Sequence, residues 1–127
     1  MKQVIETGLP TPAQPFSWAT QAAGLLFTAH GPVRPDGSVD TGDIARQARL
    51  TFENLKLATE AAGADLNDVV QVLITLLEAD DVPVVDALYG EFFAPPYPNR
   101  STVIAKALVV PGMRIEIVAY VALPDKP

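Results

Sequence analysis

Residues 69–77 read Val-Val-Gln-Val-Leu-Ile-Thr-Leu-Leu, a run in which nearly every side chain is apolar and many are β-branched. Such a run is typical of a central strand whose two faces are both largely covered, because a solvated face would show alternating polar residues. Both faces of this strand must therefore be covered by other elements.

The clearest helix is predicted for residues 43–62. Asp43 can cap its N-terminus, and Gly63 is well placed for a left-handed C-terminal cap. Apolar residues recur at spacings of three and four, which predicts one packed face. That face comprises Ile44, Ala48, Phe52, Leu55, Thr59 and Ala62, and a second, weaker stripe comprises Leu50, Leu57 and Ala61. We expect the helix to pack on a sheet and to touch a second helix.

The other elements follow from alternation and turn residues. A short strand is expected at 3–7, a loop or extended arm at 9–15, and a hairpin from strands 17–23 and 25–29 joined near Gly24. A second helix follows Asp80-Asp81, with Pro83 in its first turn. Strands at 102–107 and 114–123 complete the chain. The order β-β-β-α-β-α-β-β predicts a single α+β domain over residues 1–127, with a mixed sheet and two helices on one face.

Two helices can cover only one face of such a sheet. Val118 and Tyr120 in the last predicted strand belong to the other face, and the 69–77 strand also offers apolar residues there. A single chain has no further element with which to cover them. We therefore expect self-association.

Composition excludes several functions. The 127-residue chain has no Cys and one His, so a thiol nucleophile, a disulfide scaffold and a Cys/His zinc site are not expected. Its net charge is -6, with the Lys and Arg residues scattered, which argues against nucleic-acid binding and RNA cleavage. No signal-like or membrane-length apolar run occurs, so a cytoplasmic protein with no membrane partner is expected.

The C-terminal third concentrates the chemistry. Arg100 precedes Ser101-Thr102, and a guanidinium matches the two oxygens of a small carboxylate. Glu116 lies between Ile115 and Ile117, so it points away from the helix-covered face and can orient or activate a water molecule. The alternatives are a surface Arg100 that balances acidic residues, and a Glu116 that forms an interfacial salt bridge with Arg114 or Arg100.

Two further features have simpler readings. His30 follows the predicted strand 25–29, where binding loops occur, but a lone His is more often structural or exposed. Asp80-Asp81 is most simply a charge pair at a helix N-terminus. Nothing in the chain is similar to a phosphate-binding glycine loop.

Several motifs occur together in one order. They are Gln47-Ala48-Arg49, Glu53-Asn54-Leu55-Lys56, Glu60-Ala61-Ala62-Gly63-Ala64, Asp68-Val69-Val70, Tyr89 with Glu91-Phe92-Phe93, Pro98 with Arg100-Ser101-Thr102, and Ile115-Glu116-Ile117. In these the chain resembles the reactive-intermediate deaminase (RidA) family, also called the endoribonuclease L-PSP family, from about Pro15 to Leu123. The resemblance implies a chorismate-mutase-like fold, a homotrimer with ligand clefts between subunits, and no metal or organic cofactor.

The resemblance also implies roles for individual residues. Arg100 would grip a substrate carboxylate with the backbone near Thr102, and Glu116 would lie close to the water that attacks an imine carbon. The remaining substrate-binding positions would be Phe16, Thr28, Ala29, His30, Tyr89, Ser101 and Thr102. The implied activity is hydrolysis of small 2-imino acids to 2-keto acids and ammonia. The alternatives are a non-catalytic protein that binds carboxylate metabolites, and a deaminase dedicated to a larger aminated intermediate.

Several positions depart from the pattern of the family. Phe16 lacks a phenol hydroxyl, and Thr28-Ala29-His30 replaces a Ser-Gly-Gln segment. Asp86 replaces an Asn in the second helix, and Thr102 replaces a frequent Cys. We expect these changes to alter the substrate, with His30 supplying a proton or contacting a polar substituent.

Overall fold

A computed structural model describes residues 1–124, so the last three residues of the predicted domain lie outside the described part. The elements are β1 (Gln3–Val4), β2 (Ala19–Ala22), β3 (Leu25–His30), α1 (Ile44–Ala61), β4 (Val69–Leu76), α2 (Val82–Phe92), β5 (Asn99–Ile104) and β6 (Ile115–Ala122). Short 3₁₀ helices, η1 (Leu66–Asp68) and η2 (Ala79–Asp81), precede β4 and α2. The predicted order of strands and helices is confirmed, and so is the α+β class.

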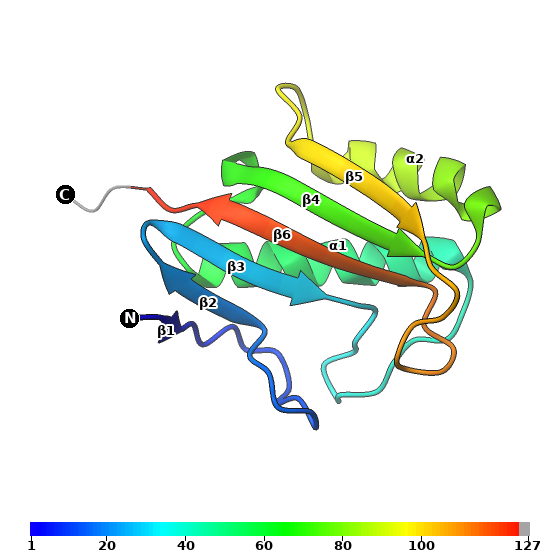
Figure 1. Ribbon diagram of the computed structural model, residues 1–127, viewed down its shortest axis with the longest axis horizontal. Helices are drawn as coiled ribbons and strands as arrows, with labels where there is room; N and C mark the ends of the chain where they lie inside the picture. The colour runs from blue at the N-terminus through cyan, green and yellow to red at the C-terminus, as the bar shows by residue number, and fades with distance from the viewer. Residues whose placement is uncertain (125–127) are drawn as a thin grey trace.

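The six strands form one mixed sheet in the order β1-β2-β3-β6-β4-β5. The β4–β5 pair is parallel, whereas the other neighbouring strands run antiparallel. Both helices lie on the same side of this sheet, and the opposite face carries no helix (Figure 1). The last strand, β6, therefore inserts between two strands that come earlier in the chain.

The hairpin of β2 and β3 turns at Ala23 and Gly24, which have φ values of 54° and 77°. Two left-handed residues form the kind of tight turn whose twist matches antiparallel strands. A glycine accommodates this conformation without strain, which explains why the turn falls where the sequence predicted it.

Helix α1 starts and ends at the predicted caps. The Asp43 carboxylate accepts a hydrogen bond from the Arg46 backbone N–H, and Gly63 has φ 83° just past the C-terminus. Its buried face is broader than the apolar pattern and includes four polar residues. The buried residues are Ile44, Gln47, Ala48, Thr51, Phe52, Asn54, Leu55, Ala58 and Thr59. The proposed second stripe is not a packed face, because Leu57 and Ala61 are exposed.

The core lies between the helices and the sheet. Along β6 the side chains alternate, and Ile115, Ile117, Ala119 and Val121 are buried under the helices. Phe52 of α1 packs against an aromatic group from the end of α2, namely Tyr89, Phe92 and Phe93. This arrangement fixes the end of α2 against α1.

Two expectations require correction. The strand predicted at 102–107 is Asn99–Ile104, because Arg100 already pairs beside Val72 and the chain leaves the sheet after Ile104. Strand β4 is covered on one face only within the chain, since Leu73 and Thr75 on the other face are just half-buried.

No helix in the described part of the chain is long and apolar enough to cross a membrane.

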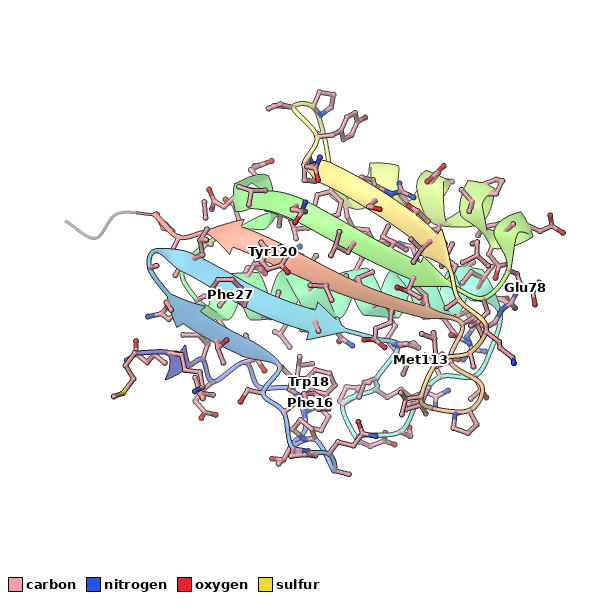
Figure 2. All side chains as sticks on the ribbon, in the orientation of Figure 1. Phe16, Trp18, Phe27, Glu78, Met113 and Tyr120 are labelled. Carbon is pink, nitrogen blue, oxygen red and sulfur yellow. The ribbon has the colours of Figure 1, made fainter. Side chains whose placement is uncertain are left out.

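The face without helices is partly apolar. Phe27 of β3 is 39% exposed, and its ring meets that of Tyr120 on β6 edge to face at 5.5 Å. Both rings stand on the side of the sheet that carries no helix (Figure 2). We call this surface, formed by Phe27, Leu73, Val118 and Tyr120, the open face. The trimer remains a prediction.

Candidate functional site

Glu116 lies on the open face, as the alternation along β6 predicted. Its neighbours Ile115 and Ile117 are 0% and 1% exposed under the helices, whereas Glu116 itself is half-buried. The two arginines considered as its partners bind elsewhere, because Arg114 pairs with Asp81 at 2.8 Å and Arg100 pairs with Asp86 at 2.7 Å. Neither salt bridge proposed for Glu116 therefore forms within the chain.

A cavity of about 480 Å³ lies at one end of the sheet beside Glu116. Three of the predicted ligand-binding residues, Phe16, Ala29 and His30, also line it. The other lining residues are mostly apolar and come from the 10–18 arm, the 31–39 loop and the segment before β6. Among residues 1–124 the lining includes one carboxylate and no Lys or Arg. This cavity can thus hold an uncharged or cationic group but has no partner for a carboxylate.

The N-terminal arm forms one wall of this cavity. The Trp18 indole N–H donates to the Pro10 carbonyl at 2.7 Å, and the Phe16 ring packs edge-on against Trp18 at 4.8 Å. Figure 2 shows Phe16 and Trp18 together near the start of β2, with Met113 at the same end of the sheet. The prolines predicted an extended arm. The arm folds over the ends of the strands, with Trp18 at its base. This fold depends on tertiary contacts, which the local sequence does not predict.

His30 is the last residue of β3 rather than part of a loop, and it is 2% exposed. The Thr28 hydroxyl donates its one proton to the Trp18 carbonyl at 2.8 Å. It must therefore accept the hydrogen bond that joins it to His30 Nε2 at 2.5 Å. His30 accordingly carries its proton on Nε2 and presents a bare lone pair at Nδ1, which is buried without a partner among residues 1–124.

Burial also fixes the charge of His30. Desolvation lowers its pKa from 6.5 to about 3, so the ring is neutral at physiological pH. The Trp18 ring stacks almost parallel to it, with centroids 6.0 Å apart and planes at 13°. A neutral ring whose only proton is engaged by Thr28 is not a proton donor. This rules against the first of the two roles expected for His30.

Arg100 lies on β5 at the other edge of the sheet, and its side chain faces α2. Its Nε–H donates to Thr102 Oγ1 at 3.0 Å, and its guanidinium carbon lies 4.6 Å from the centre of the Tyr89 ring. The Asp86 carboxylate approaches Nη2 at 2.7 Å. The guanidinium is thus held by contacts on its face and along one side, an arrangement suited to a fixed anion-binding group.

Tyr89 supports Arg100 through its ring. Its hydroxyl is buried and has no hydrogen-bond partner in residues 1–124. Burial raises the pKa of Tyr89, and the charge of Arg100 partly opposes this rise. In the single chain the Tyr89 hydroxyl is not accessible to a ligand, so its contact with Arg100 is the feature relevant to the site.

Ser101 lies on the open face, between Arg100 and Thr102 on β5. It lines a second, smaller cavity of about 260 Å³ together with Glu116, Leu73 and Val118. Glu116 therefore borders both cavities. Of the predicted residues, Phe16, Ala29, His30 and Ser101 gather around Glu116, whereas Tyr89 and Thr102 gather around Arg100.

The two charged residues do not meet within one chain. On β4, Arg100 lies opposite Val72 and Glu116 lies opposite Thr75. This register separates them by about 10 Å along the strands and about 10 Å across the sheet, on opposite faces. Each half of the predicted site is therefore incomplete within the chain. Separately, no three His, Asp or Glu side chains in residues 1–124 are grouped to bind a metal ion.

Known proteins share both the sequence and the fold. The model of the family described as Endoribonuclease L-PSP matches residues 7–123. A RutC family protein of Pyrococcus horikoshii is 38% identical over 124 residues, which cover 94% of this chain and 98% of that protein. A protein of Dermatophagoides farinae named 2-iminobutanoate/2-iminopropanoate deaminase is 36% identical over 126 residues, covering 96% and 97% of the two chains.

Among solved structures, the crystal structure of Escherichia coli TdcF with bound serine has a TM-score of 0.87 and 28% identity. The match covers 96% of this chain and 99% of that one. The family match spans nearly all of the described residues. The Pyrococcus horikoshii and Dermatophagoides farinae relatives are matched over almost their full length. The chain therefore belongs to the endoribonuclease L-PSP family, whose members include proteins named as reactive-intermediate deaminases.

Proposed function

We propose that the protein hydrolyses small 2-imino acids to 2-keto acids and ammonia, in clefts that two neighbouring copies build together. The observation that carries the proposal is the separation of Arg100 from Glu116 in one chain. The cavity beside Glu116 has no cation in its lining, and Arg100 lies at an edge strand. A substrate with a carboxylate next to an electrophilic carbon needs both the arginine and the acid. A second copy packed on the open face would bring its Arg100 to the cavity beside Glu116.

The chemistry asks little of the protein. Arg100 would bind the substrate carboxylate and so fix the position of the adjacent imine carbon. Glu116 would hold the attacking water and accept its proton as oxygen bonds to that carbon. The same carboxyl would then return the proton to the nitrogen, and the C–N bond breaks to release ammonia while the new hydroxyl gives up its proton to leave the 2-keto acid. His30 is neutral and would bound the pocket with the face and edge of its ring rather than donate a proton.

Relatives support this reading. The Dermatophagoides farinae protein carries the name of an iminobutanoate and iminopropanoate deaminase. The TdcF structure contains serine, which is a small molecule with a carboxylate beside an amine-bearing carbon. Both fit the class of ligand that an arginine and a water-positioning acid would select.

A larger aminated acid is the second candidate for the substrate. The cavity beside Glu116 encloses about 480 Å³, far more than the acid group of a substrate requires. Its apolar lining suits an extended hydrocarbon part. Comparison of turnover for imines derived from alanine, leucine and phenylalanine would decide between a small and a large substrate.

The direct test generates 2-iminopropionate with an amino-acid oxidase and follows the loss of the imine and the appearance of the keto acid. Wild type should accelerate the decay, and Arg100→Ala should lose about 30-fold or more, the effect of a lost charge-assisted contact. Arg49→Ala is the matched control, because Arg49 pairs with Glu91 on the helix side at 3.2 Å. Equal decay with wild type and with buffer would end the proposal.

A further inference from the structure

Asp86 contacts the guanidinium to which we assign the substrate carboxylate. It lies three residues before Tyr89 on α2, so the two side chains project from the same face of the helix toward β5. Asp86 Oδ1 is 2.7 Å from Arg100 Nη2, while the same guanidinium lies over the ring of Tyr89. Arg100 therefore has a carboxylate partner before any ligand arrives.

The pair is partly exposed, which leaves it open to exchange. The side chain of Asp86 is 52% exposed and that of Arg100 is 21% exposed. One Asp86 oxygen pairs with one terminal nitrogen of Arg100, and the Arg100 Nε–H donates to Thr102. An incoming carboxylate can reach the remaining donors, but it then shares the cation with a second negative charge only a few ångströms away.

The charge of the whole ligand then decides how well it binds. A 2-keto acid is a monoanion, so Arg100, Asp86 and the bound product would together carry one net negative charge. A protonated 2-imino acid carries a positive nitrogen beside its carboxylate and is neutral overall. Asp86 repels the first more than the second, because its attraction for the nitrogen offsets its repulsion of the carboxylate.

We infer that Asp86 is a specificity-determining residue that favours zwitterionic 2-imino acids over the monoanionic 2-keto acids that their hydrolysis releases. The inference rests on the proposed function, since it takes Arg100 as the carboxylate site. Its consequence is reduced product inhibition. A neutral amide at position 86 would keep the shape of the side chain and remove the selection by charge.

The test is binding, measured by isothermal titration at low salt without turnover. The probes are 2-oxobutyrate, a monoanion, and 2-aminobutyrate, a stable zwitterion of the same length. Asp86→Asn should tighten 2-oxobutyrate about fivefold and leave 2-aminobutyrate within about twofold, with Asp86→Ala changing the ratio in the same direction. Asp80→Asn is the matched control, because Asp80 is an exposed acid in η2, just before the same helix.

The outcomes separate this inference from the proposed function. If both ligands tighten equally, or if 2-oxobutyrate binding stays unchanged or weakens in Asp86→Asn, Asp86 does not select by charge and the inference is wrong. If neither ligand binds wild type, or if Arg100→Ala binds both as well as wild type does, the carboxylate site itself is wrong. Urea unfolding of each variant confirms that a lost signal does not reflect a lost fold.

Discussion

The state of His30 shows how its neighbours set the chemistry of one side chain. The Thr28 hydroxyl donates a hydrogen bond to the Trp18 backbone carbonyl and accepts one from His30, which holds the buried imidazole in one tautomer. A sequence-level reading can name His30 as a candidate but cannot assign its proton. That assignment depends on the hydroxyl of Thr28, whose direction only the fold determines.

His30 should make stability depend on pH. Its pKa is about 3 when folded and 6.5 when exposed, so the unfolded chain binds one more proton between these values. The contribution of His30 to the free energy of unfolding is fully present above about pH 6.5. This free energy then falls as the pH drops toward 3, by at most about 1.4 kcal/mol per pH unit. Urea unfolding at a series of pH values would measure this slope.

The matched variant for this experiment is His30→Gln, which keeps a hydrogen-bonding side chain but cannot titrate. Its free energy of unfolding should be nearly flat between about pH 6.5 and about pH 5, where His30 dominates. An unchanged slope in the variant would show that other groups cause the pH dependence.

At the scale of the element, Gln47 joins α1 to two loops. Its side-chain amide donates to the carbonyls of Gly42 and Gly112, both at 3.0 Å, and its oxygen accepts from the Arg114 N–H at 2.7 Å. Gln47 is 0% exposed, so water cannot replace these bonds. The start of β6, and with it Glu116, is therefore positioned partly by a polar residue of α1.

Replacement of Gln47 by Leu should destabilise the fold by about 3 kcal/mol, because α1 loses its three side-chain hydrogen bonds to the backbone of these two loops. Equilibrium urea unfolding at fixed protein concentration measures the change. Glu53→Ala is the control, since Glu53 is exposed on the same helix. A loss as small as that of the control would mean that the loops find other partners.

The elements differ in how far the sequence could predict them. Helix α1 and strand β6 were predicted to within one residue, because capping residues and strict alternation are local signals. The start of β5 was misplaced by three residues, since Asn99 and Arg100 carry no strand pattern and pair only because β4 lies beside them. The same pairing sets the side of the sheet that Arg100 occupies. Its separation from Glu116 could not be seen in the sequence.

For the whole molecule, the open face leads to a prediction about assembly. Phe27→Asp should reduce the mass measured by sedimentation, because it places a charge in the middle of a surface that we expect a second copy to cover. Val84→Asp is the matched control on α2, since Val84 is 38% exposed and Phe27 is 39% exposed. A wild-type protein that sediments as a monomer would contradict both the trimer and the shared cleft.

A shared cleft also predicts complementation between two inactive variants. Arg100→Ala and Glu116→Gln, unfolded together and refolded as a mixture, should recover deaminase activity well above that of either variant refolded alone. In mixed assemblies some clefts receive an intact arginine from one copy and an intact acid from the other. If both groups served the same chain, the mixture would stay as inactive as its parts.

The opposite-facing placement of Arg100 and Glu116 has a consequence for when such a protein can work. If the cleft is shared as we propose, a single chain would carry both groups but no complete site. On the proposed function, activity would therefore depend on protein concentration: dilution below the dissociation constant of the assembly would separate the two charges and abolish activity in every cleft.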